Sequence, residues 1–570
     1  MKVNNLNYVK ISYKGKVNKE TPNKLDDSQN YINPTVDNLK AYYGRIVPGG
    51  IERVNKQKYI KLRDEFCKEL EPRQLDANKK CWDFYINSSK ENLVAYQKAD
   101  DVYHDLFKNE NLYNIFSDLS KKDLGDKHLN KQVKDLVRDF EDECNNGEMA
   151  KALRDKENEI AAKYNSYVPM IDGKEVSKTE ITKILQNEKN PEIRKKAYEA
   201  KIKGGDLIAN DLVEFTKLRN EYAKTKGYDN FFDYQLKEIY DVEPEQLNEL
   251  LEDVYANAKH SNLKNQLENK QDLAKAFGIT PKDLKAYHYG LLLENNPVKD
   301  VNKSIKDDEH VVEIAKKAYL GMGYDIDKMP ITLDLFPRKN KNTHGFCFGI
   351  EAGKDARILA NLTNDTSSID TLCHELGHCV YDLGISTDLP YLDKDASSPA
   401  MTEAVAMMMG DLIQKENILK GVVSDDVLDR FKNDHKKSET KFINRSMQII
   451  NFEKEMYKNP DQDLGKLWHD MKCKYSGHEA GEDVDNEWAT IPHYLSHPAY
   501  YQNYFRADLM KAQMYKHLVN ELGPLSENKN TAKYLDENIF SYGKSIDEND
   551  LIEKITGEKL SSKALCENLK

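Results

Sequence analysis

Helix-breaking residues are scarce along this chain of 570 residues. It contains 27 glycines and 17 prolines, which is fewer than the roughly 7% and 5% of an average protein. Lysine, glutamate, leucine and alanine, which favour helices, are abundant instead. We therefore expect a mainly α-helical protein, and a sheet-dominated fold is disfavoured.

The charge and the hydropathy of the chain disfavour two classes of binding partner. It has 85 lysines and arginines against 97 aspartates and glutamates, a net charge of −12. Nucleic-acid binding depends on clustered positive charge, so we expect no nucleic-acid partner. No apolar run approaches the roughly 18 residues that a membrane span needs, so we expect no membrane association. An acidic surface or cleft would instead favour basic peptides.

The cysteines and the N-terminus bear on the compartment. The eight cysteines are scattered and include no Cys-x-x-Cys pair, so we expect free thiols rather than a disulfide framework. The first twenty residues lack the apolar segment of a signal peptide. We expect a cytoplasmic monomer, although an export signal trimmed from the chain would also fit the sequence.

Helical periodicity extends over most of the chain. Residues 1–40 are polar and rich in asparagine and lysine, and we expect them to lead into a single domain over 41–570. From about 50 to 165, apolar residues recur every three or four positions, which predicts long helices. The clearest apolar stripe consists of Tyr59, Leu62, Phe66 and Leu70.

Several boundaries between the expected elements are marked by particular residues. Ser177 begins a capping-box pattern, and Asn190-Pro191 is typical of a helix start. Gly227 predicts the end of a helix. Short strands are expected at 331–336 and 356–362, where β-branched and apolar residues cluster.

One five-residue motif indicates metal chemistry. His374 begins the run His-Glu-Leu-Gly-His, which ends at His378. Histidines four residues apart share one face of a helix, so both imidazoles can bind one Zn²⁺. Glu375 lies beside them and is placed to act as a general base toward water. We expect the helix to be capped at Ser367-Ser368 and to end at Gly384. A chance match on a surface helix is the alternative, and the apolar stripe around the motif disfavours it.

The third metal ligand must come from another segment. The metzincin pattern continues with a glycine and a third histidine, and neither stands at the corresponding position here. A helix is expected to begin at Pro399, and Glu403 lies within its apolar stretch. A buried carboxylate is costly unless it is paired or bound to metal, so we expect Glu403 to complete a His2Glu set for one Zn²⁺ per chain. A charge favoured by the helix dipole is the alternative. Asp370 and Asp411 are candidates to hold the imidazoles in place.

A cluster of histidines and tyrosines follows within residues 488–505. Neutral donors such as a tyrosine hydroxyl or an imidazole N–H can stabilise the oxyanion that forms during peptide hydrolysis. We therefore single out His493 and Tyr504 as candidate catalytic residues. For some of the other tyrosines, packing of a helix face is the simpler interpretation.

Several blocks together resemble a known family. They are His344-Gly-Phe-Cys-Phe, Asp355-Ala-Arg-Ile-Leu, the His-Glu-Leu-Gly-His motif, Thr402-Glu403-Ala404 and the block from His493 to Tyr504. In these blocks the chain resembles the angiotensin-converting-enzyme-like zinc peptidases, especially their bacterial single-domain type. It is also similar to the related thimet oligopeptidase and oligoendopeptidase F group.

The resemblance implies a zinc metallopeptidase of oligopeptidase or peptidyl-dipeptidase type that hydrolyses short peptides. Its fold would be a two-lobed helical clam-shell with a deep zinc cleft, a small β element beside the metal-binding helix and N-terminal lid helices at about 50–165. Zinc would be bound by His374, His378 and Glu403, with Glu375 as the base and His493 and Tyr504 on the scissile carbonyl. Further substrate contacts would come from His344, Ala360, Tyr501 and His497, with the strand around Ala360 pairing with the peptide.

Three positions depart from the angiotensin-converting enzymes. Ile491, Asn503 and Met407 stand where that family has a carboxylate-clamping lysine, a chloride-binding arginine and an aspartate. Peptidyl-dipeptidase action and chloride activation are therefore not implied. The alternative function is a helical peptide-binding or scaffold protein with an inactive site, which predicts no stoichiometric zinc.

Overall fold

The computed structural model describes residues 51–144, 147–342, 345–479 and 485–569. The lead-in expected at 1–40 lies outside these residues. The structure is 73% helix and 4% strand, which confirms the prediction of a mainly helical protein. Within the described residues, every helix is too short or too polar to cross a membrane. All eight cysteines are free thiols, as expected.

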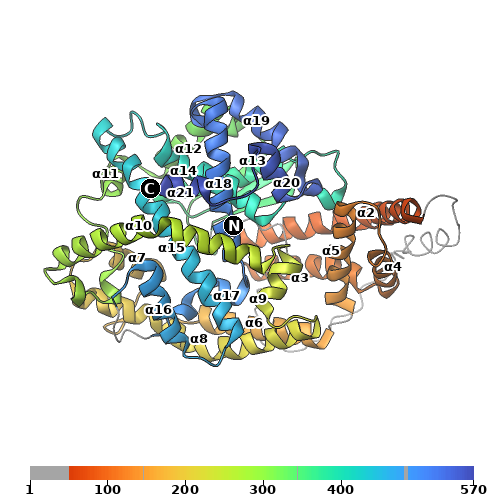
Figure 1. Ribbon diagram of the computed structural model, residues 1–570, viewed down its shortest axis with the longest axis horizontal. Helices are drawn as coiled ribbons and strands as arrows, with labels where there is room; N and C mark the ends of the chain where they lie inside the picture. The colour runs from red at the N-terminus through yellow and green to blue at the C-terminus, as the bar shows by residue number, and fades with distance from the viewer. Residues whose placement is uncertain (1–50, 145–146, 343–344, 480–484, 570) are drawn as a thin grey trace.

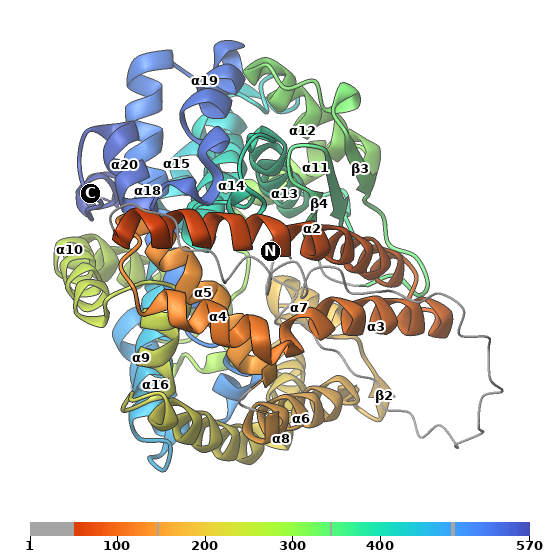
Figure 2. The same ribbon diagram turned by 90° about the vertical axis from the view of Figure 1, so that its right-hand side faces the viewer.

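The N-terminal helices form one core together with one face of a small sheet. They are α2 (Ile51–Ile86), α3 (Lys90–His104), α4 (Glu110–Ser120) and α5 (Lys127–Cys144). The stripe predicted on α2, which consists of Tyr59, Leu62, Phe66 and Leu70, is buried in this core. Phe348 and Leu359 contribute from the sheet. In Figure 2, α2 lies between helices α3 to α5 on one side and the half of the molecule that contains the sheet on the other.

A second core lies largely in the lower half of Figure 1. Its helices are α6 (Gly147–Asn165), α8 (Pro191–Thr225), α9 (Phe231–Tyr234), α10 (Pro244–Phe277), α15 (Asp425–Lys458), α16 (Leu464–Ser476), α17 (His493–Ser496) and α21 (Lys563–Leu569). A hairpin of β1 (Met170–Ile171) and β2 (Lys174–Glu175) and the helix α7 (Lys178–Asn187) pack beside it. The predicted boundaries are confirmed: Ser177 caps α7, Pro191 begins α8, and Gly227 follows α8 with a φ of 86°.

The third core contains the remaining helices and the other face of the sheet. Its helices are α11 (Pro297–Ser304), α12 (Asp308–Met322), α13 (Thr366–Gly384), α14 (Pro399–Lys415), α18 (Tyr501–Leu522), α19 (Asn530–Asn538) and α20 (Glu548–Thr556). One stripe of α18, including Met510, packs in this core, and another, including Phe505, packs in the second core. This helix therefore joins the two.

The small sheet has three strands in the order β3-β5-β4. β3 (Ile331–Asp334) runs parallel to β5 (Asp355–Leu359), and β4 (Phe346–Glu351) runs antiparallel to β5. β3 and β5 correspond to the predicted strands, whereas β4 was not predicted. Its two faces pack in different cores, Cys347 in the third and Phe348 in the first, so the strand lacks the polar alternation by which a strand is recognised.

A cavity of about 1430 Å³ lies where the three cores meet. Its walls come from α2, α5, α6, α8, β4 and the segment around α17. The N-terminal helices that were expected to form a lid thus provide one wall, although Ile160 of α6 packs in the second core instead. The clam-shell form itself stays a prediction.

Candidate active site

The two helices that carry the predicted metal ligands cross in close contact. α13 provides His374 and His378, and α14 provides Glu403. A Cβ atom at Gly377 would lie 2.8 Å from the Cα atom of Ala406, which is closer than packed atoms approach. The glycine within the motif therefore allows the two backbones to meet, and this contact brings the carboxylate to the imidazoles.

The starts of these helices differ in how well they were predicted. α14 begins at Pro399, and Ser398 caps it by accepting a hydrogen bond from a backbone N–H at 3.0 Å. The expected cap of α13 at Ser367-Ser368 is wrong. Asp365 is the cap, because its carboxylate accepts from the backbone N–H of Ser368 at 2.8 Å.

The three predicted ligands converge on one point. Glu403 Oε2 lies 3.5 Å from His374 Nε2 and 3.8 Å from His378 Nε2. Ligand atoms that bind one tetrahedral Zn²⁺ at its usual bond lengths lie about 3.3–3.5 Å apart, whereas an N–H···O bond is shorter. The side chains of His378 and Glu403 are almost fully buried, and that of His374 is 22% exposed. The residues thus fit one zinc ion that is open to solvent on the His374 side.

Two hydrogen bonds orient the ligands. His378 Nδ1 bonds to Thr402 Oγ1 at 2.8 Å, which directs Nε2 toward Glu403. Tyr500 Oη donates to Glu403 Oε1 at 3.0 Å, which leaves Oε2 for the metal. Sequence reasoning missed both roles. Thr402 directly precedes a predicted ligand and Tyr500 belongs to the tyrosine-rich block, but no local pattern specifies such contacts.

The aspartates that were expected to hold the imidazoles have other neighbours. Asp411 lies 2.7 Å from Lys511 Nζ and 3.3 Å from His435 Nε2. Asp370 lies against α14, where a Cβ atom at Gly410 would be 2.7 Å from its Oδ1. The prediction for Asp411 is therefore wrong, because α18 supplies an ammonium group that binds it.

The site favours positive charge. Burial opposes the charged form of His374, but the nearby carboxylates of Glu403 and Glu375 raise the pKa of its imidazole. Burial likewise opposes the charge of Glu403, yet the adjacent imidazole of His374 lowers the pKa of this carboxyl. A group of two buried carboxylates and two imidazoles is an arrangement that a divalent cation stabilises.

Glu375 faces the beginning of strand β4. The residue is 4% exposed, and a Cβ atom at Gly345 would lie 3.9 Å from its Oε1. Glycine at this position keeps the space in front of the carboxylate free of a side chain. Glu375 therefore lies between the helix that carries the two histidines and the start of β4.

The predicted histidines and tyrosines form one aromatic cluster. The ring of His493 lies 4.7 Å from that of Tyr501, 5.8 Å from that of His497 and 6.0 Å from that of Tyr504. Within the described residues, neither ring nitrogen of His493 has a hydrogen-bond partner. Burial lowers the pKa of His493 to about 3, so the imidazole is neutral at working pH.

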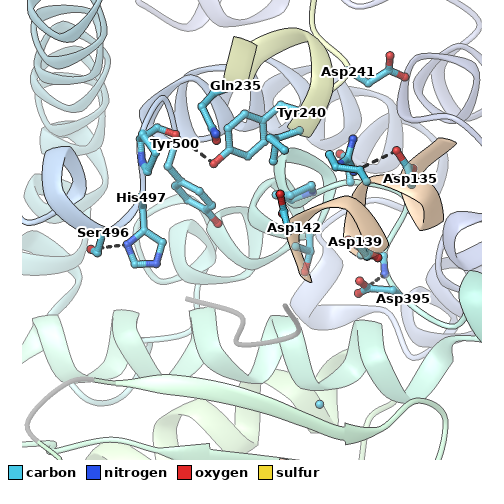
Figure 3. Close-up of a pocket in the computed structure, with 18 of the residues that line it drawn as sticks. Asp135, Asp139, Asp142, Gln235, Tyr240, Asp241, Asp395, Ser496, His497 and Tyr500 are labelled. Atoms are coloured by element: carbon cyan, nitrogen blue, oxygen red, sulfur yellow. Dashed lines mark hydrogen bonds and ion pairs between the residues drawn. The ribbon is translucent and has the colours of Figure 1, made fainter. Parts of the chain in front are cut away.

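Tyr504 lies within the electrostatic reach of the metal ligands. Burial and the negative charges of Glu403 and Glu375 raise the pKa of its hydroxyl well above the usual value. The hydroxyl therefore keeps its proton and can donate a hydrogen bond. His497 is held by a 2.7 Å hydrogen bond between its Nδ1 and Ser496 Oγ, which Figure 3 shows at the edge of the cavity.

The two remaining predicted substrate contacts have different outcomes. His344 lies outside the described residues. Ala360 donates its N–H to Asp334 O at 2.8 Å, and its carbonyl accepts from Lys341 Nζ at 2.5 Å. Because β5 is also paired on both sides, pairing with a peptide, as predicted around Ala360, needs another strand edge. β4 is the neighbouring edge, and Phe346 and Gly349 of this strand line the cavity.

The comparison with protein families supports this site. The family model described as Peptidase family M3 matches residues 184–308 and 328–570. The match includes the three ligands, Glu375 and the aromatic cluster, and it corresponds to the thimet oligopeptidase side of the resemblance. The family match does not confirm the narrower resemblance to angiotensin-converting-enzyme-like peptidases. The comparison with curated proteins found no match.

Proposed function

Because the chain belongs to peptidase family M3, whose members are zinc-dependent metallopeptidases acting on peptides, we propose that it hydrolyses short peptides with one Zn²⁺ held by His374, His378 and Glu403. The observation that carries this proposal is the convergence of these three buried ligand atoms beside Glu375. Burying these ionisable groups together is costly, and a scaffold protein would have no use for their convergence.

The cavity sets the size of substrate that we propose. Walls from α2, α5 and β4 surround it, so an extended peptide fits and a folded protein does not. Among the described residues, β4 pairs only with β5, which leaves its other edge for the peptide backbone. Ile491, at the position of the carboxylate-clamping lysine, lines the cavity, which favours oligopeptidase over peptidyl-dipeptidase action.

The proposed mechanism divides the reaction between bound zinc and three side chains. Bound zinc would polarise the scissile carbonyl and lower the pKa of water. Glu375 takes a proton from the attacking water and passes it to the leaving amine. The neutral imidazole of His493 and the protonated hydroxyl of Tyr504 donate hydrogen bonds to the carbonyl oxygen as its negative charge develops.

The replacement Glu375→Gln tests this assignment. We expect hydrolysis of a mixed library of short peptides, followed by mass spectrometry, to fall about 10²–10⁴-fold, while the zinc content per chain stays near that of the wild type. Glu439→Gln, the same change at another buried carboxylate, is the control and should leave hydrolysis unchanged. Retained activity in Glu375→Gln would refute the base assignment. A wild-type chain with neither zinc nor hydrolysis would favour the alternative of a helical peptide-binding protein.

A further inference from the structure

The cavity beside the candidate active site has an acidic lining. Among the described residues that line it, fourteen are aspartates or glutamates and eight are lysines or arginines. Some of these acids are neutralised within the wall: Asp135 pairs with Arg138 at 3.1 Å, and Asp241 pairs with Lys131 at 2.5 Å. The question is which acidic groups remain available to a ligand.

Two carboxylates on α5 remain available. Asp139 and Asp142 are three residues apart on one face of the helix, and both line the cavity (Figure 3). Asp142 accepts a hydrogen bond from Tyr222 Oη at 3.2 Å. In the part of the chain that the structure describes, neither carboxylate forms an ion pair. Burial raises the pKa of Asp139 to about 7 although the charges of Arg138 and Lys544 oppose the shift, which reflects the cost of burying an ionised carboxylate.

A buried amide oxygen faces the same part of the cavity. Gln235 is 3% exposed and begins the π-helical turn η3 (Gln235–Ile239). Figure 3 shows its side chain among the residues that line the cavity, near Tyr240. Within the described residues, its Oε1 atom has no hydrogen-bond partner. A buried acceptor of this kind is unfavourable unless a ligand donates to it.

This group of acceptors lies close to the metal ligands. Tyr240 directly follows η3, and its ring lies 6.2 Å from the ring of Tyr500. Tyr500 in turn donates its hydroxyl hydrogen to Glu403. A single aromatic contact therefore separates the turn that carries Gln235 from a residue that holds a zinc ligand. A peptide at the active site can reach both.

We propose that Asp139, Asp142 and Gln235 form a subsite for the positively charged side chain of a lysine or arginine in the substrate. The inference rests on the proposed function, because it assigns the substrate class of the same cavity. Lysine and arginine provide several N–H donors and a positive charge, and the two carboxylates and the unpaired amide oxygen of Gln235 are acceptors for such donors. An acidic side chain would be repelled, and an apolar one would leave the acceptors unsatisfied.

Turnover of a lysine scan tests the subsite. The probes are heptapeptides with blocked termini in which one lysine replaces norleucine at each position in turn, so that only the charge differs. We expect the wild type to have a kcat/KM about tenfold higher or more for lysine at one position. The double replacement Asp139→Asn with Asp142→Asn should abolish this preference, so that the lysine peptide and the all-norleucine peptide have the same kcat/KM. Asp135→Asn, at an acid already paired with Arg138, is the matched control and should keep the preference.

Binding measurements separate this inference from the proposed function. The dissociation constants of the same peptides are measured with the zinc-loaded Glu375→Gln protein, with and without the two asparagine replacements. If the wild type cleaves none of the peptides, the proposed hydrolysis is refuted. Tighter binding of a lysine peptide that requires Asp139 and Asp142 would still support the subsite. If peptides are cleaved but lysine gives no advantage in either assay, or the advantage survives the double replacement, the subsite is refuted and hydrolysis stands.

Discussion

The described residues contain two groups of histidine and carboxylate side chains whose ligand atoms lie within 4.8 Å of one another. The first consists of His374, His378 and Glu403, and the second of Asp411, His435 and Glu439. Both join α14 to another helix, and both are largely buried. They differ in the source of positive charge.

In the second group, the chain supplies its own cation. Lys511 is 3% exposed and places its Nζ 2.7 Å from Asp411 and 3.3 Å from Glu439. Burial opposes the charge of Asp411, but Lys511 and Lys415 hold the pKa of this carboxyl well below its usual range. In the first group, Glu403 Oε2 faces two imidazoles. The comparison shows that residue types alone do not make a metal site; the site must also lack an internal ammonium group.

The largest effect is expected from Glu403→Ala. Removal of the carboxylate leaves two imidazoles, which do not form the complete His2Glu set, so zinc and peptide hydrolysis should both be lost. Elemental analysis of the purified protein measures zinc per chain. Glu439→Ala, a change in the second group, should leave the zinc content of the protein unchanged. The assignment of Glu403 would be wrong if its variant still contained about one zinc per chain, and the distinction between the groups would fail if Glu439→Ala lost it.

A large effect on stability is expected from Lys511→Met. The change removes the ammonium group beside the buried Asp508 and leaves Asp411 and Glu439 with the more distant Lys415, at 3.4 and 3.7 Å. It should lower the free energy of unfolding by about 3–5 kcal/mol. Chemical denaturation measures this loss. Lys516→Met, on the same helix but 54% exposed in its pair with Glu567, should change stability little. If the free energy of unfolding of Lys511→Met equalled that of the wild type, the second group would not depend on its internal cation.

A smaller effect is expected from Tyr500→Phe, which removes the hydrogen bond to Glu403 and retains the ring. Loss of a group that orients a metal ligand typically weakens metal binding about 10–100-fold. Competition with a chelator of known affinity measures the change. Tyr515→Phe on α18, the helix that Tyr500 directly precedes, removes a hydroxyl that instead donates to Glu416 at 3.3 Å and should leave zinc affinity unchanged. Equal affinities in the two variants would remove Tyr500 from the metal site.

A last effect concerns the pH dependence of stability and involves Glu453, a buried carboxyl outside both groups. It is fully buried, its Oε1 accepts from Ala499 N at 2.8 Å, and burial raises its pKa from 4.5 to about 8. The folded protein retains this proton up to about pH 8, whereas the unfolded chain releases it near pH 4.5. Stability is therefore lost as the pH rises between these values, at most about 1.4 kcal/mol per unit of pKa difference.

Glu453→Gln should remove this dependence on pH. Urea denaturation at pH 5, 7 and 9 should show the variant gaining stability relative to the wild type as the pH rises. Glu455→Gln, at a more exposed position of the same helix, should follow the wild type. If the free energies of unfolding of Glu453→Gln and the wild type changed with pH in the same way, Glu453 would be ionised in the folded protein, as Asp411 is.

Some features of the site follow from local rules and others do not. His374, Glu375 and His378 were recognisable because helix geometry places residues four apart on one face. Glu403 was recognisable because an acidic residue in an apolar helix needs a partner. Asp411 was wrongly expected to hold an imidazole of the ligand pair, because Lys511, which binds it, lies a hundred residues away in the sequence. Strand β4 was missed because both of its faces are buried.

The sequence by itself determined that the protein is mainly helical, where α13 ends and where α14 begins, and which residues are of the types that bind zinc. These properties depend on spacing within one or two turns of helix. Only the tertiary structure decided that Tyr500 orients Glu403, that Lys511 occupies the second group, and that Asp139, Asp142 and Gln235 line one cavity. Such contacts join residues far apart in the chain, so they depend on how the three cores pack rather than on any local pattern.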